Sequence, residues 1–331
     1  MKIVICDDRP NLMRDIPYEV KMLEDNLPGA EVEVYEYKED DLPDFYQHIS
    51  DADAIINTVC VMNNGAFDHA KKLKCLAQNG VGFNMVDVPA ATAHGVMVCP
   101  ASEYCTDEVA EHAMALILAL RRGLRTFIMD AENRVWDYHR AGTLKRLSGE
   151  TLAVFGYGKI GKAVAQRARA MGMHVLVVSN HLSAQDAAAD QVEVVNWKEA
   201  FERADVISNH MPLRADSEGY FDYEKFSCAK QQPLFINTGR GASVNEDDLV
   251  RALDEGLIAG AGLDVLKSEI IDFDNVPFLG RNNVILTPHV AFYSGQSELD
   301  LQTMSCNSVI YAMTGHPEKI ARLLNKKELG M

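Results

Sequence analysis

The sequence lacks an excess of positive charge, and this absence limits the partners of the protein. Its 331 residues include 32 lysines and arginines against 48 aspartates and glutamates, which gives a formal net charge of −16 at pH 7. Nucleic acids and anionic membranes are polyanions that are bound through basic residues. We therefore expect neither nucleic acid nor membrane as the main partner.

Long hydrophobic runs are also missing. The longest apolar run of the central helical region, residues 113–120, has 8 residues, whereas a membrane-spanning helix requires roughly 20. The first residues have a short strand pattern and no apolar leader followed by a cleavage site, so we expect no signal peptide. The sequence also contains no low-complexity tract, long linker or solenoid repeat.

Cysteines are few and are not spaced as metal ligands. The seven cysteines form an odd number without paired spacing, so we expect reduced thiols, a cytoplasmic location and no metal site. Cys60 and Cys105 are candidates for positions near a cleft, but a buried structural cysteine is the favoured interpretation for both.

Strand-like and helix-like segments alternate along the whole chain, which is typical of parallel sheets covered by helices. A chain of this length is expected to form two domains. We expect strands in the first part at residues 2–6, 31–37, 54–59, 77–79 and near 96–99. In the second part, strands are expected at residues 151–155, 174–178, 205–208, 233–237, 260–263 and 283–286.

Three expected helices organise the chain, and the first and third of them mark the domain boundaries. The first covers residues 106–122, with Thr106 as its N-cap, acidic residues in its first turn and arginines in its last. The second covers residues 159–171 and follows a glycine-rich turn. The third covers residues 297–313 and returns to the first domain. We therefore expect a discontinuous substrate domain at residues 1–100 plus 294–331 and a dinucleotide-binding domain at residues 101–293.

A glycine turn follows the expected strand at residues 151–155. Gly156 permits a tight turn, Gly158 lets the backbone approach a pyrophosphate, and Gly161 lets the next helix pack closely on the sheet. The N–H groups at the start of that helix would face the phosphate charge. The pattern is specific here because a strand precedes it and a helix follows it.

The position that selects between NAD and NADP carries no acid. Ser179 stands at the end of the second strand and is followed by Asn180 and His181. An acidic residue there would accept hydrogen bonds from the ribose 2′-OH and repel a 2′-phosphate. No arginine is present to attract that phosphate either, so both cofactors remain open.

Three side chains with complementary chemistry follow later strands. His289 is the candidate acid/base because imidazole titrates near neutral pH. Glu269 would hydrogen-bond the imidazole and stabilise its charged form. Arg240 offers a planar fork for a carboxylate and can polarise a keto oxygen. At the carboxyl ends of parallel strands, this set predicts reduction of a 2-keto acid by hydride transfer.

These motifs resemble the D-isomer-specific 2-hydroxyacid dehydrogenases over nearly the entire chain. The resemblance rests on the Gly156–Gly161 turn, on the segments 237–241, 262–265 and 287–289 with Glu269, and on residues 80–87. It is closest to the branch of D-lactate, D-hydroxyisocaproate and vancomycin-resistance dehydrogenases. It implies two Rossmann-like or flavodoxin-like α/β domains, an active site in the interdomain cleft, and a homodimer formed through the cofactor domain.

The resemblance also implies individual site residues. Arg240 would bind the substrate, His289 would be the acid/base and Glu269 its partner, with Asp264 facing the nicotinamide carboxamide. The cofactor would also contact Tyr157, Lys159, Ile160, Ser179, His210, Met211, Pro212, Thr238 and Gly239. The backbone of Val81 and Gly82 would hold the substrate carboxylate, and Tyr293 either lines the pocket or serves packing.

Two other functions share features with this sequence. Corepressors that resemble C-terminal binding proteins share this fold and can keep the same triad, so an NAD(H)-sensing interaction protein is the alternative to an enzyme. The first strand, residues 3–8, also looks like that of a response-regulator receiver. We reject the receiver because the segment 54–57 ends in Asn57 where the phosphoacceptor aspartate would be required.

Overall fold

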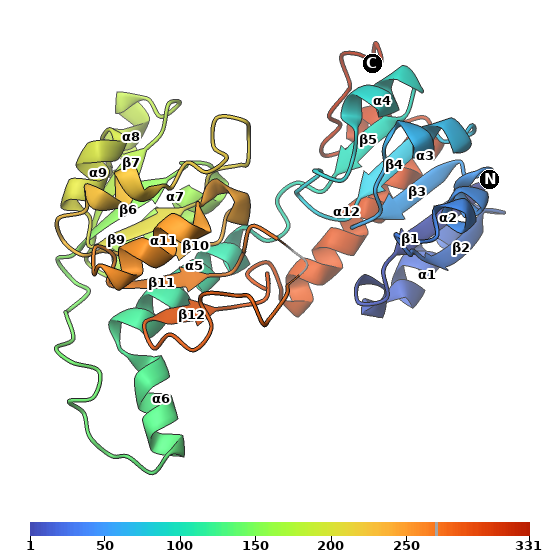
Figure 1. The fold of residues 1–331 in the computed structure, drawn as a ribbon. Coiled ribbons are helices and arrows are strands. Elements are labelled where there is room, and N and C mark those ends of the chain that lie inside the picture. The colour runs from blue at the N-terminus through green and yellow to red at the C-terminus, as the bar shows by residue number, and fades with distance from the viewer. Residues whose placement is uncertain (269–270) are drawn as a thin grey trace. The chain divides into compact units, whose positions relative to one another are not determined.

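The structure is a computed structural model that describes residues 1–268 and 271–331, and its contacts divide the chain into two compact units (Figure 1). The first unit comprises Met1–Tyr104 and Ser294–Met331, and the second comprises Cys105–Tyr293. The first unit is discontinuous because the last long helix, α12, belongs to it. The assignment of substrate binding to the first unit stays a prediction.

A parallel sheet in the order β2-β1-β3-β4-β5 forms the centre of the first unit. Its strands are β1 (Lys2–Asp7), β2 (Glu31–Glu36), β3 (Ala54–Asn57), β4 (Cys75–Gln78) and β5 (Met97–Pro100). Apolar residues pack α2 (Leu42–Ile49), α3 (Asn64–His69) and α4 (Val88–Ala93) on one face and α1 (Ile16–Asn26) and α12 (Gly295–Met313) on the other. Short 3-10 turns lie at Asn11–Met13 and Pro317–Lys319.

The second unit contains a longer parallel sheet in the order β12-β11-β10-β9-β6-β7-β8. Its strands are β6 (Thr151–Phe155), β7 (His174–Val178), β8 (Glu193–Val194), β9 (Val206–Asn209), β10 (Leu234–Asn237), β11 (Gly260–Leu263) and β12 (Val284–Leu286). The strands β6, β9, β10 and β11 are almost wholly buried, which explains their nearly continuous apolar sequences.

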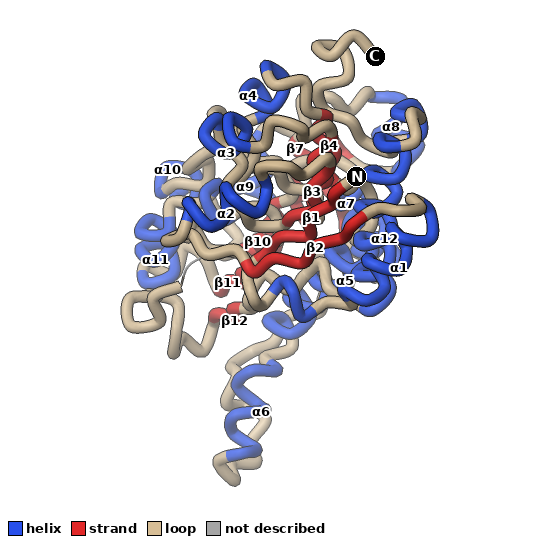
Figure 2. The backbone as a smooth tube through the Cα atoms, turned by 90° about the vertical axis from the view of Figure 1, so that its right-hand side faces the viewer, coloured by secondary structure: helices blue, strands red, loops and turns tan. Residues whose placement is uncertain are grey.

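Helices cover both faces of this second sheet. One face carries α5 (Thr106–Arg121) and α7 (Lys159–Ala170), and the other carries α9 (Trp197–Arg203), α10 (Tyr223–Ser227) and α11 (Glu246–Asp254). Two more helices are α8 (Ala184–Asp190) and α6 (Leu124–Glu132), and a 3-10 turn lies at Gly241–Ser243. Figure 2 shows α6 extending away from the strands of its own unit.

The predicted α/β class with two parallel sheets is confirmed. The N-cap expected at Thr106 is wrong: α5 begins at Thr106, and Cys105 occupies the cap position without a side-chain cap. Asp107 and Glu108 still place negative charge in the first turn, where the helix dipole favours it. Among the helices of the described residues, none has the length and apolar character required to cross a membrane.

Candidate active site

The candidate active-site residues of the second unit follow strands of one parallel sheet, so they lie at its carboxyl edge. Strand order reverses around β6, which pairs with β7 on one side and β9 on the other. Phe155 at the end of β6 is the register partner of Asn209 at the end of β9. Open parallel sheets bind ligands at such a switch point.

Each of the three glycines in the turn after β6 is a glycine for a different structural reason. Gly156 has φ +88°, and a Cβ there would lie 2.8 Å from the backbone of His210. A Cβ on Gly161 would lie 2.1 Å from the carbonyl oxygen of Gly156. A Cβ on Gly158 would meet no atom within 4 Å. The fold therefore requires the first and third glycines, whereas the second leaves open space for a ligand.

Helix α7 begins directly beyond this space, with Lys159 and Ile160 as its first residues. Its last turn carries Arg167 and Arg169, and its N-terminus is of the kind at which helix N–H groups can bind an anion. The side chain of Tyr157 donates a hydrogen bond of 3.1 Å to Asp190. Tyr157 is one of the predicted cofactor contacts. Because its hydroxyl is bonded to Asp190, its backbone is the part that can contact a cofactor.

The end of β7 carries the predicted ribose contact. Ser179 is half-buried, and its hydroxyl accepts a hydrogen bond of 3.3 Å from the N–H of His181. Asn180 and His181 are exposed. This edge therefore presents neutral polar groups, and none of these three side chains is a carboxylate that would repel a 2′-phosphate.

His210 follows β9 and is held in a neutral form. Its Nε2 lies 2.8 Å from the Ser208 hydroxyl, and its Nδ1 lies 3.4 Å from the Thr238 hydroxyl. Desolvation by burial lowers the pKa of the imidazole to about 4. The predicted contacts Met211 and Pro212 come next and are half-buried and exposed, respectively.

A buried amide network positions the loop that carries Arg240. Asn209 donates to the side-chain oxygens of Asn237 at 3.0 Å and Ser243 at 2.8 Å. Asn237 and Ser243 both donate to the carbonyl oxygen of Arg240, at 3.1 and 2.6 Å. Sequence reasoning gave these three residues no role, although the asparagines that end two neighbouring apolar strands were a visible signal.

Gly239 and Gly241 flank Arg240 and allow close backbone approach. A Cβ at Gly241 would lie 1.8 Å from the carbonyl oxygen of Leu266, so no other residue fits there. The N–H of Gly239 donates to the Asn237 side chain at 3.0 Å. The guanidinium of Arg240 donates to the carbonyl oxygen of Gly239 at 2.8 Å.

Asp264 organises the segment that contains His289. Its buried carboxylate accepts hydrogen bonds from the Thr287 hydroxyl at 2.6 Å and from the N–H groups of Val290 and Ala291, each at 2.9 Å. Its carbonyl oxygen accepts from the N–H of His289 at 2.8 Å. Both carboxylate oxygens therefore bind this segment, and the contact of Asp264 with the nicotinamide stays a prediction.

His112 on α5 completes this network and was missed by sequence reasoning. Its Nε2 lies 3.0 Å from the Thr287 hydroxyl and 3.5 Å from the Asp264 carboxylate. In the sequence, His112 lies on a helix four residues after Glu108, and this spacing does not indicate that its partners are Thr287 and Asp264.

His289 itself is exposed and adopts a left-handed backbone conformation, with φ +50°. A non-glycine residue in this region carries strain that the surroundings must hold, and such residues cluster at functional sites. The ring of Phe292 lies 6.3 Å from the imidazole, and Tyr293 is 57% exposed. Glu269, the predicted partner of His289, lies outside the described residues.

In the first unit, the predicted carboxylate contacts Val81 and Gly82 follow β4. Neither N–H has a hydrogen-bond acceptor among the described residues, while Gly80 on one side and Val86 on the other donate to backbone carbonyls. Two adjacent unpaired donors are a suitable arrangement for an anion.

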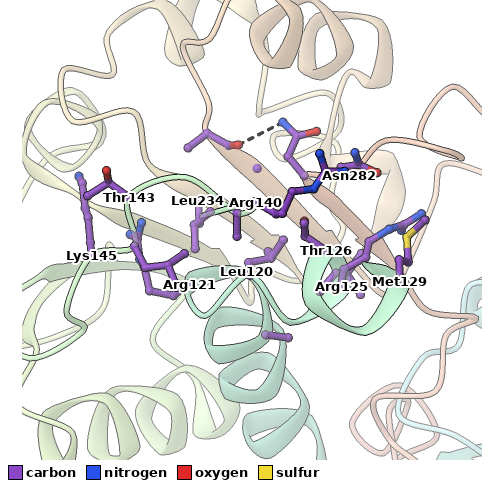
Figure 3. Close-up of a pocket in the computed structure, with 18 of the residues that line it drawn as sticks. Leu120, Arg121, Arg125, Thr126, Met129, Arg140, Thr143, Lys145, Leu234 and Asn282 are labelled. Atoms are coloured by element: carbon purple, nitrogen blue, oxygen red, sulfur yellow. Dashed lines mark hydrogen bonds between the residues drawn. The ribbon is translucent and has the colours of Figure 1, made fainter. Parts of the chain in front are cut away.

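The second unit also has a cavity of about 740 Å³ that lies away from the candidate active-site residues (Figure 3). Leu234 and Gly260, the first residues of β10 and β11, line it together with residues of α6. It therefore lies at the amino ends of the strands, opposite the glycine turn and His289. This cavity is not the candidate dinucleotide site.

The chain belongs to the D-isomer-specific 2-hydroxyacid dehydrogenase family, because residues 114–291 match the family model described as "D-isomer specific 2-hydroxyacid dehydrogenase, NAD binding domain". The second unit therefore contains the NAD-binding domain of this family. The predicted resemblance to this family is confirmed.

Three relatives illustrate the range of the similarity. D-3-phosphoglycerate dehydrogenase 2 of Arabidopsis thaliana is 34% identical over 82% of this chain, which spans only 44% of that relative. Hydroxypyruvate reductase of Blautia hydrogenotrophica is 30% identical over 85% of this chain and 88% of its own. D-lactate dehydrogenase from Aquifex aeolicus, solved with NAD and lactic acid, superposes with a TM-score of 0.87 at 26% identity, covering 97% and 98% of the two chains.

Proposed function

We propose that this protein is a cytoplasmic NAD(P)H-dependent reductase that converts a 2-keto acid into a D-2-hydroxy acid. The observation that carries this function is the placement of Gly156, Arg240 and His289 after β6, β10 and β12 of one parallel sheet. A dinucleotide turn, an anion-binding cation and an acid/base thus share one sheet edge. The seven cysteines form no disulfide in the part of the chain that the structure describes, and all except Cys228 are buried, in agreement with a reducing compartment.

The dinucleotide would be held by the backbone of the turn at Gly156–Gly161 and by the start of α7, and it would supply the hydride. The open space beside Gly158 fits the close approach of a pyrophosphate. Thr238 and Gly239 after β10, and His210, Met211 and Pro212 after β9, are the further contacts that we assign. The neutral His210 side chain places no charge there.

The chain's own side chains would handle the proton and the substrate anion. His289 would donate a proton to the oxygen of the former carbonyl group, with Glu269 stabilising the imidazolium. Arg240 would pair with the substrate carboxylate and polarise the keto oxygen. Val81 and Gly82 would add backbone N–H donors to that carboxylate, and Tyr293 would line the pocket.

Cofactor choice follows from the chemistry at Ser179. A serine hydroxyl can hydrogen-bond a ribose 2′-OH, and it does not repel a 2′-phosphate as a carboxylate would. We therefore propose that the enzyme accepts both NADH and NADPH, with no more than about a tenfold preference between them.

We also propose that the protein forms a homodimer through the second unit. None of the nine residues of helix α6 is fully buried, and Trp136 in the following segment is 95% exposed. An isolated helix of this length is marginal in water, so a covering surface is expected. Residues 121–146 carry seven arginines and lysines against three acids in a chain of net charge −16, which favours a second copy as the partner.

The test is oxidation of NADH and NADPH with pyruvate, 2-ketoisocaproate, phenylpyruvate, glyoxylate and hydroxypyruvate. We expect turnover of at least one, with His289→Ala lowering kcat by about 10²–10⁴-fold and Arg240→Ala weakening both substrate binding and rate. Full activity of either variant would refute the assignment. Dinucleotide binding without turnover of any keto acid would favour the NAD(H)-sensing interaction protein instead.

A further inference from the structure

The C-terminal segment of the chain is fixed along the edge strand of the first sheet (Figure 1). The N–H of Leu324 donates to the carbonyl oxygen of Val98 in β5 at 3.0 Å. Asn325 is buried, accepts from the N–H of Val98 at 3.2 Å and donates to Thr92 and Val96 at 2.9 and 2.8 Å. The segment therefore pairs the free edge of β5 and has a defined register there.

This register places Arg322 against the loop that follows β4. Its Nη1 donates to the carbonyl oxygen of Val81 at 3.0 Å and to that of Ala101 at 3.4 Å. Its guanidinium carbon lies 5.4 Å from the centre of the Phe83 ring. Across residues 1–268 and 271–331, no carboxylate oxygen lies within 4 Å of a guanidinium nitrogen of Arg322. Its positive charge is therefore directed at backbone carbonyls.

The carbonyl oxygen of Val81 and the N–H of Gly82 belong to the same peptide unit. That unit is trans, as are all peptide bonds of the described residues, so the N–H points away from the guanidinium. A hydrogen bond from a cation to the carbonyl oxygen fixes the peptide plane and polarises it. Both effects make the Gly82 N–H a better oriented and stronger donor.

We propose that Arg322 is a positioning residue for substrate binding: it holds the Val81–Gly82 peptide so that the Gly82 N–H receives the carboxylate of the 2-keto acid. This inference rests on the proposed function, since it assigns the anion at Gly82 to the substrate. It adds a residue from the last turns of the chain that touches neither substrate nor dinucleotide. Its effect should therefore appear in KM and not in the proton or hydride step.

The experiment compares Arg322→Met and Arg322→Lys with Lys327→Met. Lys327 is an exposed cation of the same segment, so its variant removes the same charge without touching the loop. Steady-state kinetics with the best keto acid of the panel gives KM and kcat, and titration gives the Kd of NADH. Hydrogen exchange of the Gly80 and Val86 amides, which are hydrogen-bonded within the loop, reports the order of the loop in the unliganded protein without turnover.

We expect Arg322→Met to raise KM about tenfold, the loss of roughly one charge-assisted hydrogen bond, with kcat and the Kd of NADH within about twofold. Arg322→Lys should raise KM less, because it keeps the charge but not the fork. Loop exchange should be faster in Arg322→Met and unchanged in Lys327→Met.

Two results would overturn the inference. One is a KM and a loop exchange rate of Arg322→Met that equal those of the wild type. The other is a Lys327→Met variant with the same rise in KM, which would show a general charge effect. If Arg322→Met does not fold, the same comparison is made with Arg322→Lys. If the wild type turns over no keto acid, the proposed function fails, and hydrogen exchange alone still decides whether Arg322 orders the loop.

Discussion

Asp264→Asn is the substitution that most directly tests how the protein holds His289. The carboxylate accepts three hydrogen bonds from the segment 287–291, two on Oδ1 and one on Oδ2. An asparagine can present its oxygen to only one of these two sides. In its better orientation its amide nitrogen faces the N–H of Ala291, so a buried donor loses its acceptor and meets another donor.

The magnitude follows from this geometry. A buried donor left without its charged acceptor costs about 2–3 kcal/mol. Across a unit of this size, that loss corresponds to a decrease of roughly 4–12 °C in Tm. The hydrogen bonds of Asp264 also help to hold His289 in its left-handed backbone conformation, so the substitution weakens that restraint. A histidine displaced by about 1 Å lowers kcat by about 10²-fold.

Thermal unfolding and steady-state kinetics of Asp264→Asn measure both effects. Asp254→Asn is the matched control, because it neutralises an exposed aspartate of the same unit that is paired with Arg281. We expect the control to keep the Tm and kcat of the wild type. Asp264→Asn with unchanged Tm and unchanged kcat would show that the three hydrogen bonds do not position His289.

Three further predictions concern the second unit. Gly158→Ala should keep the wild-type Tm but weaken dinucleotide binding at least about tenfold. Gly161→Ala should also destabilise the fold by about 1–3 kcal/mol, because its Cβ would lie 2.1 Å from a backbone oxygen. Thermal unfolding and dinucleotide titration distinguish the two variants. The pKa of His210 is lowered to about 4 from an ordinary value near 6.5, so the unfolded state binds the proton first and stability falls as the pH drops from 6.5 to 4. Denaturant unfolding at pH 7 and 4.5 should show a loss of about 2 kcal/mol that is absent in His210→Gln. Trp136→Ser should weaken self-association in sedimentation; an unchanged dimer would exclude this residue from the interface.

The fold was largely predictable from the sequence because strands buried on both faces have a strong local signature. The strands at Thr151–Phe155, His174–Val178 and Gly260–Leu263 have the bounds predicted for them. Most other predicted strands differ by one or two residues at an end, where a strand's last hydrogen bonds depend on its neighbours. The N-cap of α5 was misplaced by one residue: the sequence favours a polar cap, but the helix already begins at Thr106 and Cys105 occupies the cap position.

The sequence by itself determined the family and the kinds of side chain that carry the chemistry: a glycine turn after a strand, and an arginine and a histidine after later strands. These signals are local, because glycine conformation and strand ends are set by neighbours in the chain. Only the tertiary structure decided what holds these groups. Asp264 binds the segment of His289, Asn209 anchors the loop of Arg240, and Arg322 meets the carbonyl of Val81 from 241 residues away. Such contacts depend on sheet order and on which helix returns to which strand, and no local pattern encodes them.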